Sequence, residues 1–303
     1  MKVFVTGASG HIASAVIPEL ITAGHAVTGL ARSGAAAARV EGLGAEVRRG
    51  DLGDRDALTA AADEADGVIH LAFDHAAQGA GDLAGAAATD LLAVQSIGAA
   101  LAGTGKPFVS TNATGGICLA GFTGLLTEDD VLPGGPRVDA ENVTISLASQ
   151  GVRSSVVRLP PAVHGDGRYG FVSGLIDTAR ATGRAGYCGD GGNRWGSADT
   201  HDVAVVYRIA LESAPAGARL HAVAEEGIPL RRIAETIARR LGVPVSPTSA
   251  EEAEKRFGYL TPFVAMDNPA SSRVTRTLLG WAPSGTGLIE SLEQDPALVA
   301  SAG

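Results

Sequence analysis

The sequence predicts an α/β fold in which a mainly parallel sheet is covered by helices on both faces. Short β-branched apolar runs alternate with segments of helical periodicity, a pattern typical of parallel strands joined by crossover helices. The length of 303 residues and the hydrophobic content of 45% are sufficient for one large domain and a smaller lobe. Strands are expected at residues 2–6, 26–31, 45–49, 67–72, 106–111, 153–159 and 218–224.

The first strand leads into a glycine-rich turn and a helix, with the sequence Thr6-Gly7-Ala8-Ser9-Gly10-His11-Ile12-Ala13. Gly7 stands where the chain must bend tightly, and Gly10 where the backbone must approach a pyrophosphate without a Cβ in the way. An ordinary strand, turn and helix is the alternative, but this order of elements favours a dinucleotide-binding unit. The expected contacts in the turn are Gly7, Ser9, Gly10, His11 and Ile12.

The second strand ends in Arg32-Ser33, which bears on the choice of cofactor. An acidic residue at this strand end binds the ribose 2′-hydroxyl of NAD, whereas an arginine favours the 2′-phosphate of NADP. Arg32 and Ser33 are therefore expected to bind NADP, with NAD as the less favoured cofactor. The alternative for Arg32 is a solvated surface arginine.

The later elements continue the alternation. The alanine-rich segment from Leu83 to Ala102 is expected to be the helix before the fifth strand, and a core helix is expected from Pro229 to Gly242. The loops lengthen after the sixth strand, as an inserted lobe requires. We expect a Rossmann domain with a doubly wound parallel sheet and a smaller C-terminal substrate-binding lobe. The Rossmann domain is predicted at residues 1–164, completed by about 201–224, and the lobe at 165–200 and 225–303.

Several motifs together resemble the extended short-chain dehydrogenase/reductase superfamily of the epimerase and dehydratase type. They are the glycine turn, Gly50-Asp51-Leu52, Val68-Ile69-His70-Leu71-Ala72, Arg158-Leu159-Pro160-Pro161-Ala162-Val163-His164-Gly165, and Leu279-Gly280-Trp281-Ala282-Pro283. The resemblance implies that Asp51 and Leu52 contact the adenine and that Leu71 and Ala72 line the ribose and pyrophosphate. It also implies that the loop containing Pro160 lies near the nicotinamide.

The chain departs from this superfamily at the catalytic positions. A Tyr-x-x-x-Lys pair normally supplies the proton for hydride transfer, but no tyrosine precedes Tyr169 and no lysine lies between Lys106 and Lys255. Aligned on Ala140-Glu141, the resemblance puts Pro133 at the tyrosine position and Arg137 at the lysine position. Arg137 could still hold the nicotinamide ribose, but a proline has no proton to donate.

Other residues are therefore candidates for the chemistry. Asn112 stands in place of the superfamily's serine, His164 stands where a tyrosine is usual, and Tyr169 follows in a glycine-rich loop. We expect these three to be the catalytic residues, although His164 could instead bond backbone. Asp74 and His75 follow the fourth strand at the end where ligand crevices form, with helix capping as the alternative for Asp74. In the lobe, Asn193, Arg194 and Trp195 could face a ligand, or Trp195 could be core.

Composition limits the classes of partner and compartment. The net charge of −9 argues against nucleic acid and against an anionic membrane surface. Cys118 and Cys188 have no metal-ligand spacing, so no metal site is expected. Met1 leads directly into a strand, which leaves no room for a signal peptide, and we expect a cytoplasmic protein.

Three functions are compatible with these residues. The favoured one is an NADP-dependent oxidoreductase that reduces a small carbonyl- or imine-type metabolite with a non-standard proton donor. The others are a non-redox isomerase, epimerase or lyase with bound cofactor, and an inactive NADP-sensing regulatory protein. The resemblance also implies a homodimer formed by the helices at Leu91 to Ala102 and Asp139 to Ser149.

Overall fold

A computed structural model describes residues 1–299 and contains a seven-stranded, fully parallel sheet at the core of the larger domain. The strand order is β10-β6-β5-β4-β1-β2-β3. The strands are β1 (Lys2–Thr6), β2 (Ala26–Ala31), β3 (Glu46–Arg49), β4 (Gly67–His70), β5 (Pro107–Ala113), β6 (Arg153–Leu159) and β10 (Ala218–His221). The predicted fold class and all seven predicted strands of this sheet are confirmed.

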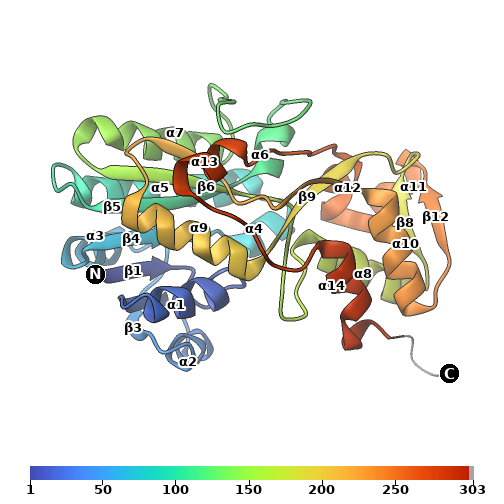
Figure 1. The fold of residues 1–303 in the computed structure, drawn as a ribbon, viewed down its shortest axis with the longest axis horizontal. Helices are drawn as coiled ribbons and strands as arrows, with labels where there is room; N and C mark the ends of the chain where they lie inside the picture. The colour runs from blue at the N-terminus through green and yellow to red at the C-terminus, as the bar shows by residue number, and fades with distance from the viewer. Residues whose placement is uncertain (300–303) are drawn as a thin grey trace.

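Helices cover both faces of this sheet (Figure 1). On one face α3 (Arg55–Glu64), α5 (Leu83–Leu101) and α7 (Val138–Ser146) pack side by side, and on the other α1 (Ala13–Thr22) packs on α9 (Thr200–Ser213) beside α2 (Gly34–Gly42). Two short helices, α4 (His75–Gly79) and α6 (Thr114–Leu119), follow β4 and β5. The central strands β1 and β4 are buried on both faces and are apolar runs without alternation, whereas β3 at the edge of the sheet is polar and partly exposed.

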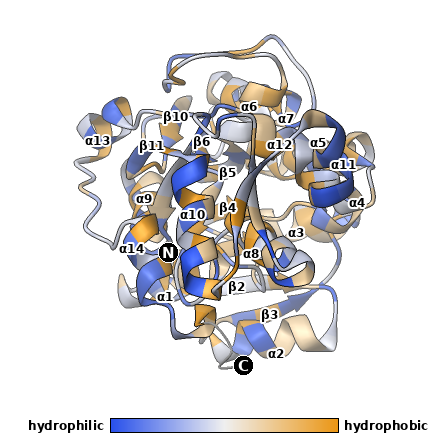
Figure 2. Ribbon diagram, turned by 90° about the vertical axis from the view of Figure 1, so that its right-hand side faces the viewer, coloured by the Kyte–Doolittle hydropathy of each residue, from blue (hydrophilic) through white to orange (hydrophobic). Residues whose placement is uncertain are grey.

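The smaller lobe lies at the right in Figure 1 and is built around two small sheets. One contains β7 (Ala162–His164), β9 (Arg194–Asp199) and β11 (Glu225–Pro229), and the other contains β8 (Ala185–Cys188) and β12 (Val245–Thr248). Its helices are α8 (Phe171–Thr182), α10 (Leu230–Leu241), α11 (Ala250–Phe257), α12 (Thr261–Ala265) and α14 (Leu288–Gln294). Figure 2 shows hydrophilic and hydrophobic residues on different sides of α10, whose apolar side packs in the lobe core as expected.

The C-terminal region divides between the two parts of the molecule, whereas the sequence suggested that all of residues 225–303 belong to the lobe. Helix α13 (Arg273–Leu279) contacts α9 and β10 of the larger domain. Trp281 is 3% exposed within the core of that domain, and its Nε1 donates to the Asp202 carbonyl at 3.1 Å. The Asp202 carboxylate accepts from the backbone N–H groups of Ser284 and Gly285, both at 2.9 Å. Asp202 therefore fastens the C-terminal segment to the larger domain.

Helix α5 is the one helix in residues 1–299 that is long and apolar enough to cross a membrane. It packs between α3 and α7, and it contributes Val94, Ile97 and Leu101 to the core beneath the sheet. Its apolar character is therefore explained by burial in this layer.

Candidate functional site

The sheet has a topological switch point between β1 and β4. The chain leaves β1 toward β2 and β3 and then returns to β4 on the opposite side of β1. Loops that follow neighbouring strands on either side of such a point diverge, and the crevice between their carboxyl ends is where α/β proteins bind ligands. The glycine turn follows β1, and the segment Leu71 to His75 follows β4.

The glycine turn is held tightly against the end of β4. Gly7 has a φ of +66°, and a Cβ there would lie 2.7 Å from the backbone nitrogen of Ala72 and 2.8 Å from the carbonyl carbon of Leu71. Only glycine fits both this conformation and this approach. A Cβ on Gly10 would meet only the Gly7 oxygen, at 3.1 Å, so this residue leaves the outer side of the turn open.

The glycine turn leads directly into the amino end of α1. No side chain caps this helix end, whose preceding residue is Ile12. The backbone N–H groups at a helix start carry partial positive charge and suit an anion. Together with the open side of Gly10, they form a cradle of the shape and charge that a pyrophosphate requires.

A buried polar chain fixes the two strand ends relative to each other. The Oγ1 of Thr6 lies 2.7 Å from Nδ1 of His70, and Nε2 of His70 lies 3.0 Å from Oδ1 of Asp90. The backbone N–H of Ala72 donates to Thr6 Oγ1 at 3.3 Å. If the hydrogen of the neutral His70 ring is on Nε2, that atom donates to Asp90 and the Thr6 hydroxyl donates to Nδ1. In this tautomer Thr6, both His70 ring nitrogens and Oδ1 of Asp90 have hydrogen-bond partners. These hydrogen bonds therefore link the ends of β1 and β4.

His11 links the glycine turn to the start of the lobe. Its Nε2 donates to the Val163 carbonyl at 3.1 Å, while its buried Nδ1 has no partner within the described residues. Burial lowers the pKa of His11, so the neutral ring is favoured. Ser9 and Ile12, on either side, are partly exposed at the turn. The predicted turn residues are thus brought together at one edge of the sheet.

The end of the crevice beside β2 is positively charged. Arg32 is exposed directly after β2, and Ser33 caps α2 by accepting from the Ala36 N–H at 3.1 Å. Asp51 follows β3 and accepts from the Gly53 N–H at 3.0 Å, and Leu52 is partly exposed. A second arginine, Arg49, is exposed here and in register with Ala31 at the end of β2, although no local motif marks it as a ligand-binding residue. The pairing of β2 with β3 places Arg49 beside the end of β2, so a prediction of this pairing could have identified it.

Arg137 lies at the other end of the crevice, in a strained conformation. Its φ is 65°, and within the described residues the only other non-glycine residue with a positive φ is Asp166. Its Nη2 donates to the Thr111 carbonyl at 2.8 Å, and its guanidinium lies 4.0 Å from the ring centroid of Phe73. Burial lowers the pKa of this arginine, and its Nε is buried with no partner within the described residues. Strain and an unused buried donor are typical of a ligand-binding position.

Asn112 belongs to a buried network and not to the open edge. Its Nδ2 donates to Oε2 of Glu141 at 2.7 Å. Glu141 also accepts from Arg158 through Nη2 at 2.6 Å and Nε at 3.1 Å, and from Arg219 at 2.8 Å. Burial alone would raise the pKa of Glu141, but these partners, led by Arg158, hold it below its usual value. Asn112 therefore holds the carboxylate that anchors α7 to β6.

His164 is fully buried, and neither ring nitrogen has a partner within the described residues. Burial lowers its pKa below the usual value, against the opposing charges of Asp199 and Glu225. Its carbonyl accepts from Thr200 Oγ1 at 2.8 Å, which ties β7 to the start of α9. The predicted catalytic ring is therefore enclosed behind the strand, and no face of it reaches the crevice.

Tyr169 is also turned away from the crevice. It is 3% exposed in the lobe core, and its hydroxyl donates to Oδ2 of Asp295 at 2.7 Å. Burial and the neighbouring carboxylate raise its pKa. A hydroxyl that is buried, already donating and harder to ionise is a poor proton donor for a ligand. Its contacts fasten the chain after α14 to the lobe.

The remaining candidates have mainly structural contacts. Asn193 donates to the carbonyls of Val264 at 2.9 Å and Met266 at 3.0 Å, and Arg194 pairs with Asp267 at 2.8 Å. Trp195 is fully buried and donates to the Phe263 carbonyl at 3.2 Å, so it is part of the lobe core. Pro133 is exposed in the loop before α7. Pro160 is buried against Gly196, where the larger domain meets the lobe.

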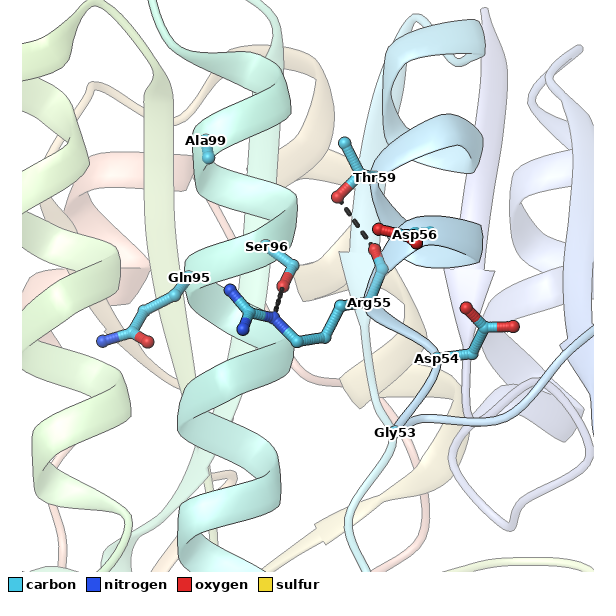
Figure 3. Close-up of a pocket in the computed structure, with 8 residues that line it drawn as sticks. All are labelled: Gly53, Asp54, Arg55, Asp56, Thr59, Gln95, Ser96 and Ala99. Atoms are coloured by element: carbon cyan, nitrogen blue, oxygen red, sulfur yellow. Dashed lines mark hydrogen bonds between the residues drawn. The ribbon is translucent and has the colours of Figure 1, made fainter.

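A polar hollow of about 480 Å³ lies between α3 and α5 (Figure 3). Across it, the Arg55 Nε donates to the Ser96 Oγ at 3.1 Å, while Asp54 caps α3. The hollow lies on the helical layer and not at the switch point. We place the ligand site at the switch point and not in this hollow, because the glycine turn, Arg32 and Arg137 all lie at the switch point.

Comparisons with known proteins agree with the fold. The profile described as "NAD dependent epimerase/dehydratase family" matches residues 3–113, which contain the glycine turn and the first five strands. An uncharacterized protein of Schizosaccharomyces pombe is 41% identical over 298 residues, covering 97% of this chain and 99% of that protein.

Two solved structures share the fold over nearly the whole chain. One, described as MoeE5 in complex with UDP-glucuronic acid and NAD, has a TM-score of 0.77 at 22% identity and covers 98% of both chains. The other is the dTDP-glucose 4,6-dehydratase of Bacillus anthracis in complex with NAD, with a TM-score of 0.74 at 15% identity, covering 99% of this chain and 98% of that one. The chain therefore belongs to the same family as the Schizosaccharomyces pombe protein, and its residues 3–113 match the NAD dependent epimerase/dehydratase family.

Proposed function

We propose that this protein binds NADP(H) along the switch-point crevice and reduces a small carbonyl- or imine-type metabolite. The observation that carries the proposal is the arrangement at one sheet edge of an open glycine turn, an uncapped helix start and exposed arginines beside β2. The nicotinamide of such a cofactor supplies a hydride when bound.

The residues of the crevice have separate roles in this proposal. The turn from Gly7 to Gly10 and the start of α1 bind the pyrophosphate through backbone N–H groups. Arg32, joined by Arg49, binds the 2′-phosphate through charge-assisted hydrogen bonds. Arg137 holds the nicotinamide ribose with its Nε donor, which has no partner within the described residues. The adenine lies against Asp51 and Leu52, and the remaining walls are formed by Leu71, Ala72 and Pro160.

Family membership favours a second candidate, an epimerase or dehydratase that keeps its cofactor bound through the reaction. The two functions differ in a measurable way. A reductase releases oxidised cofactor and turns over NADPH, whereas an epimerase or dehydratase regenerates its cofactor and shows no net consumption. Release of cofactor on denaturation, combined with absent net turnover, would favour the second candidate.

The cofactor choice is tested by calorimetric titration of the native protein with NADPH and NADH. We expect NADPH to bind more tightly, and Arg32→Asp to remove most of that preference, because a hydrogen bond to a charged group contributes about 1.5–3 kcal/mol. Arg39→Asp is the matched control, because Arg39 is an exposed arginine in the last turn of α2, at the opposite sheet edge. Equal affinity of the native protein for both cofactors would contradict the assignment.

A further inference from the structure

The crevice needs a proton donor, and the three residues that were predicted to be catalytic do not provide one. Reduction of a carbonyl leaves an oxygen that must accept a proton, and a positioned acid typically accelerates such a step about 10²–10⁴-fold. Asn112 is bonded to Glu141, His164 is enclosed, and Tyr169 donates to Asp295. None of these three side chains presents a free polar atom to the crevice.

His75 has the placement that these three lack. It is the first residue of α4, directly beyond β4, and therefore on one wall of the switch point. The residue is exposed, although one side of its ring packs against Phe73 and is shielded from solvent there. The neighbouring Asp74 is already used as a helix cap, because its Oδ1 accepts from the N–H groups of Ala76 at 3.1 Å and Ala77 at 3.0 Å.

The contacts of His75 define which nitrogen can exchange a proton. Its Nδ1 lies 3.1 Å from Oε1 of Gln78, an acceptor, so Nδ1 carries a hydrogen. The Nε2 atom, on the opposite side of the ring, makes no hydrogen bond within the described residues. Gln78 thus fixes the ring and leaves Nε2 as the group that gains and loses a proton.

An aromatic contact places this ring beside the ribose-binding arginine of the proposed function. The rings of His75 and Phe73 meet edge to face, with centroids 5.2 Å apart and an interplanar angle of 68°. The Arg137 guanidinium lies 4.0 Å from the centroid of the same Phe73 ring. Phe73 therefore holds Arg137 and His75 in one cluster at the carboxyl edge.

We propose that Nε2 of His75 is the proton donor for reduction at this site, an inference that rests on the proposed function. As the carbonyl carbon gains a hydride from a reduced nicotinamide, the C=O π bond breaks and its electron pair moves to oxygen. The Nε2–H bond of the imidazolium breaks, and an O–H bond forms. The substrate is reduced to an alcohol, the nicotinamide is oxidised, and neutral His75 regains its proton from solvent. In the reverse direction neutral Nε2 accepts the proton.

The surroundings of His75 set its pH dependence. Burial and the charge of Arg137 lower its pKa, and Gln78 and Asp74 oppose them. The net direction is downward from 6.5, so the imidazolium is lost as the pH rises through this lowered value. Reduction should therefore slow, and oxidation should quicken, with rising pH.

The placement of His75 is tested by NMR on the full chain labelled with ¹³C at histidine Cε1, with NADP⁺ as the probe. The His75 signal is assigned from its loss in His75→Gln, and His25→Gln assigns the control. His25 precedes β2 at the opposite sheet edge and bonds Glu212 at 3.0 Å. We expect NADP⁺ to shift the His75 signal and its titration midpoint and to leave the His25 signal unchanged. An unshifted His75 signal, with NADP⁺ binding verified by calorimetry, would overturn the inference.

The donor role is measured by single-turnover oxidation of bound NADPH with a panel of aldehydes, ketones and imines. We expect His75→Gln to slow this step by about 10²–10⁴-fold, to keep the NADPH dissociation constant within about twofold, and to remove the pH-dependent limb. An unchanged rate in His75→Gln would overturn the donor role. Failure of the native protein to bind NADP⁺, or to reduce any member of the panel, would contradict the proposed function itself.

Discussion

The guanidinium of Arg137 lies 4.0 Å from the ring centroid of Phe73, although a left-handed backbone at φ 65° is needed to bring it there. A cation over an aromatic face is attracted by the ring quadrupole, and the contribution of about 2 kcal/mol at a desolvated site is comparable with the cost of about 1–3 kcal/mol for backbone strain. The bond to the Thr111 carbonyl adds to the compensation. Such strain is typical of a residue retained for binding.

Arg137 should therefore contribute to cofactor affinity more than to folding. We expect Arg137→Gln to weaken NADPH binding by about 10- to 150-fold, the equivalent of a charged hydrogen bond of about 1.5–3 kcal/mol. Arg137→Lys keeps the positive charge and must adopt the same left-handed backbone, so it should weaken NADPH binding less than Arg137→Gln does. Calorimetry measures both. Native-like affinity in the glutamine variant would remove Arg137 from the site.

Gly7 provides a test of the close approach between the two strand ends. Gly7→Ala adds a Cβ at 2.7 Å from the Ala72 nitrogen in a left-handed conformation, whereas Gly24→Ala adds one at φ +86° with nothing within 4 Å. The free energy of unfolding of the Gly24 variant should fall by about 1–2 kcal/mol because of backbone strain alone. The free energy of unfolding of the Gly7 variant should fall by about 1–3 kcal/mol more, because the added Cβ overpacks the contact with β4. Urea unfolding compares them, and equal losses would show that the approach is not tight.

The buried carboxylate of Glu141 predicts a pH dependence of stability. Its pKa in the folded protein lies below the ordinary value of 4.5, so the stabilisation is fully present above 4.5 and is lost as the pH falls through the folded value. Glu141→Gln leaves Arg158 without its buried partner and should cost about 3–5 kcal/mol at pH 7. The difference from the native protein should shrink below pH 4.5. A gap in unfolding free energy that stays constant down to pH 3 would contradict this role.

The predicted homodimer remains a proposal for which α5 and α7 are the expected surface. These helices pack side by side, and Leu92 on α5 is 44% exposed. We expect sedimentation to give a dimer mass at micromolar concentration, and Leu92→Glu to give a monomer because it places a charge in the apolar contact. Leu278→Glu is the control, because Leu278 is an equally exposed leucine on α13, outside α5 and α7. A monomeric native protein would dispose of the dimer.

The larger domain could be predicted because its central strands β1, β2 and β4 are largely apolar runs, as buried parallel strands are, and because they alternate with helical segments. The lobe strands could not. Arg194–Asp199 and Val245–Thr248 are short and contain polar residues, glycine or proline, so their local sequence does not distinguish strand from loop. Their pairing depends on partners distant in the sequence, as in the parallel register of Val245 with Ala185.

The binding part of the site was more predictable than the catalytic part. A glycine turn encodes its backbone geometry locally, so Gly7 and Gly10 could be identified from their spacing. Side-chain direction depends on distant contacts. Tyr169 turns toward Asp295, 126 residues later, and no local pattern signals this. His75 could be placed at a strand end, but its exposure and its relation to Arg137 through Phe73 required the folded chain.

Calorimetric titration of NADPH into the native protein and into Gly10→Val tests the central claim most directly. A Cβ on Gly10 meets only the Gly7 oxygen, at 3.1 Å, so we expect the valine variant to stay folded while its side chain fills the position of the pyrophosphate. The native protein should bind NADPH more tightly than NADH, and the folded variant should give no binding heat with either cofactor. A folded Gly10→Val protein that binds NADPH with native affinity would contradict the cofactor site.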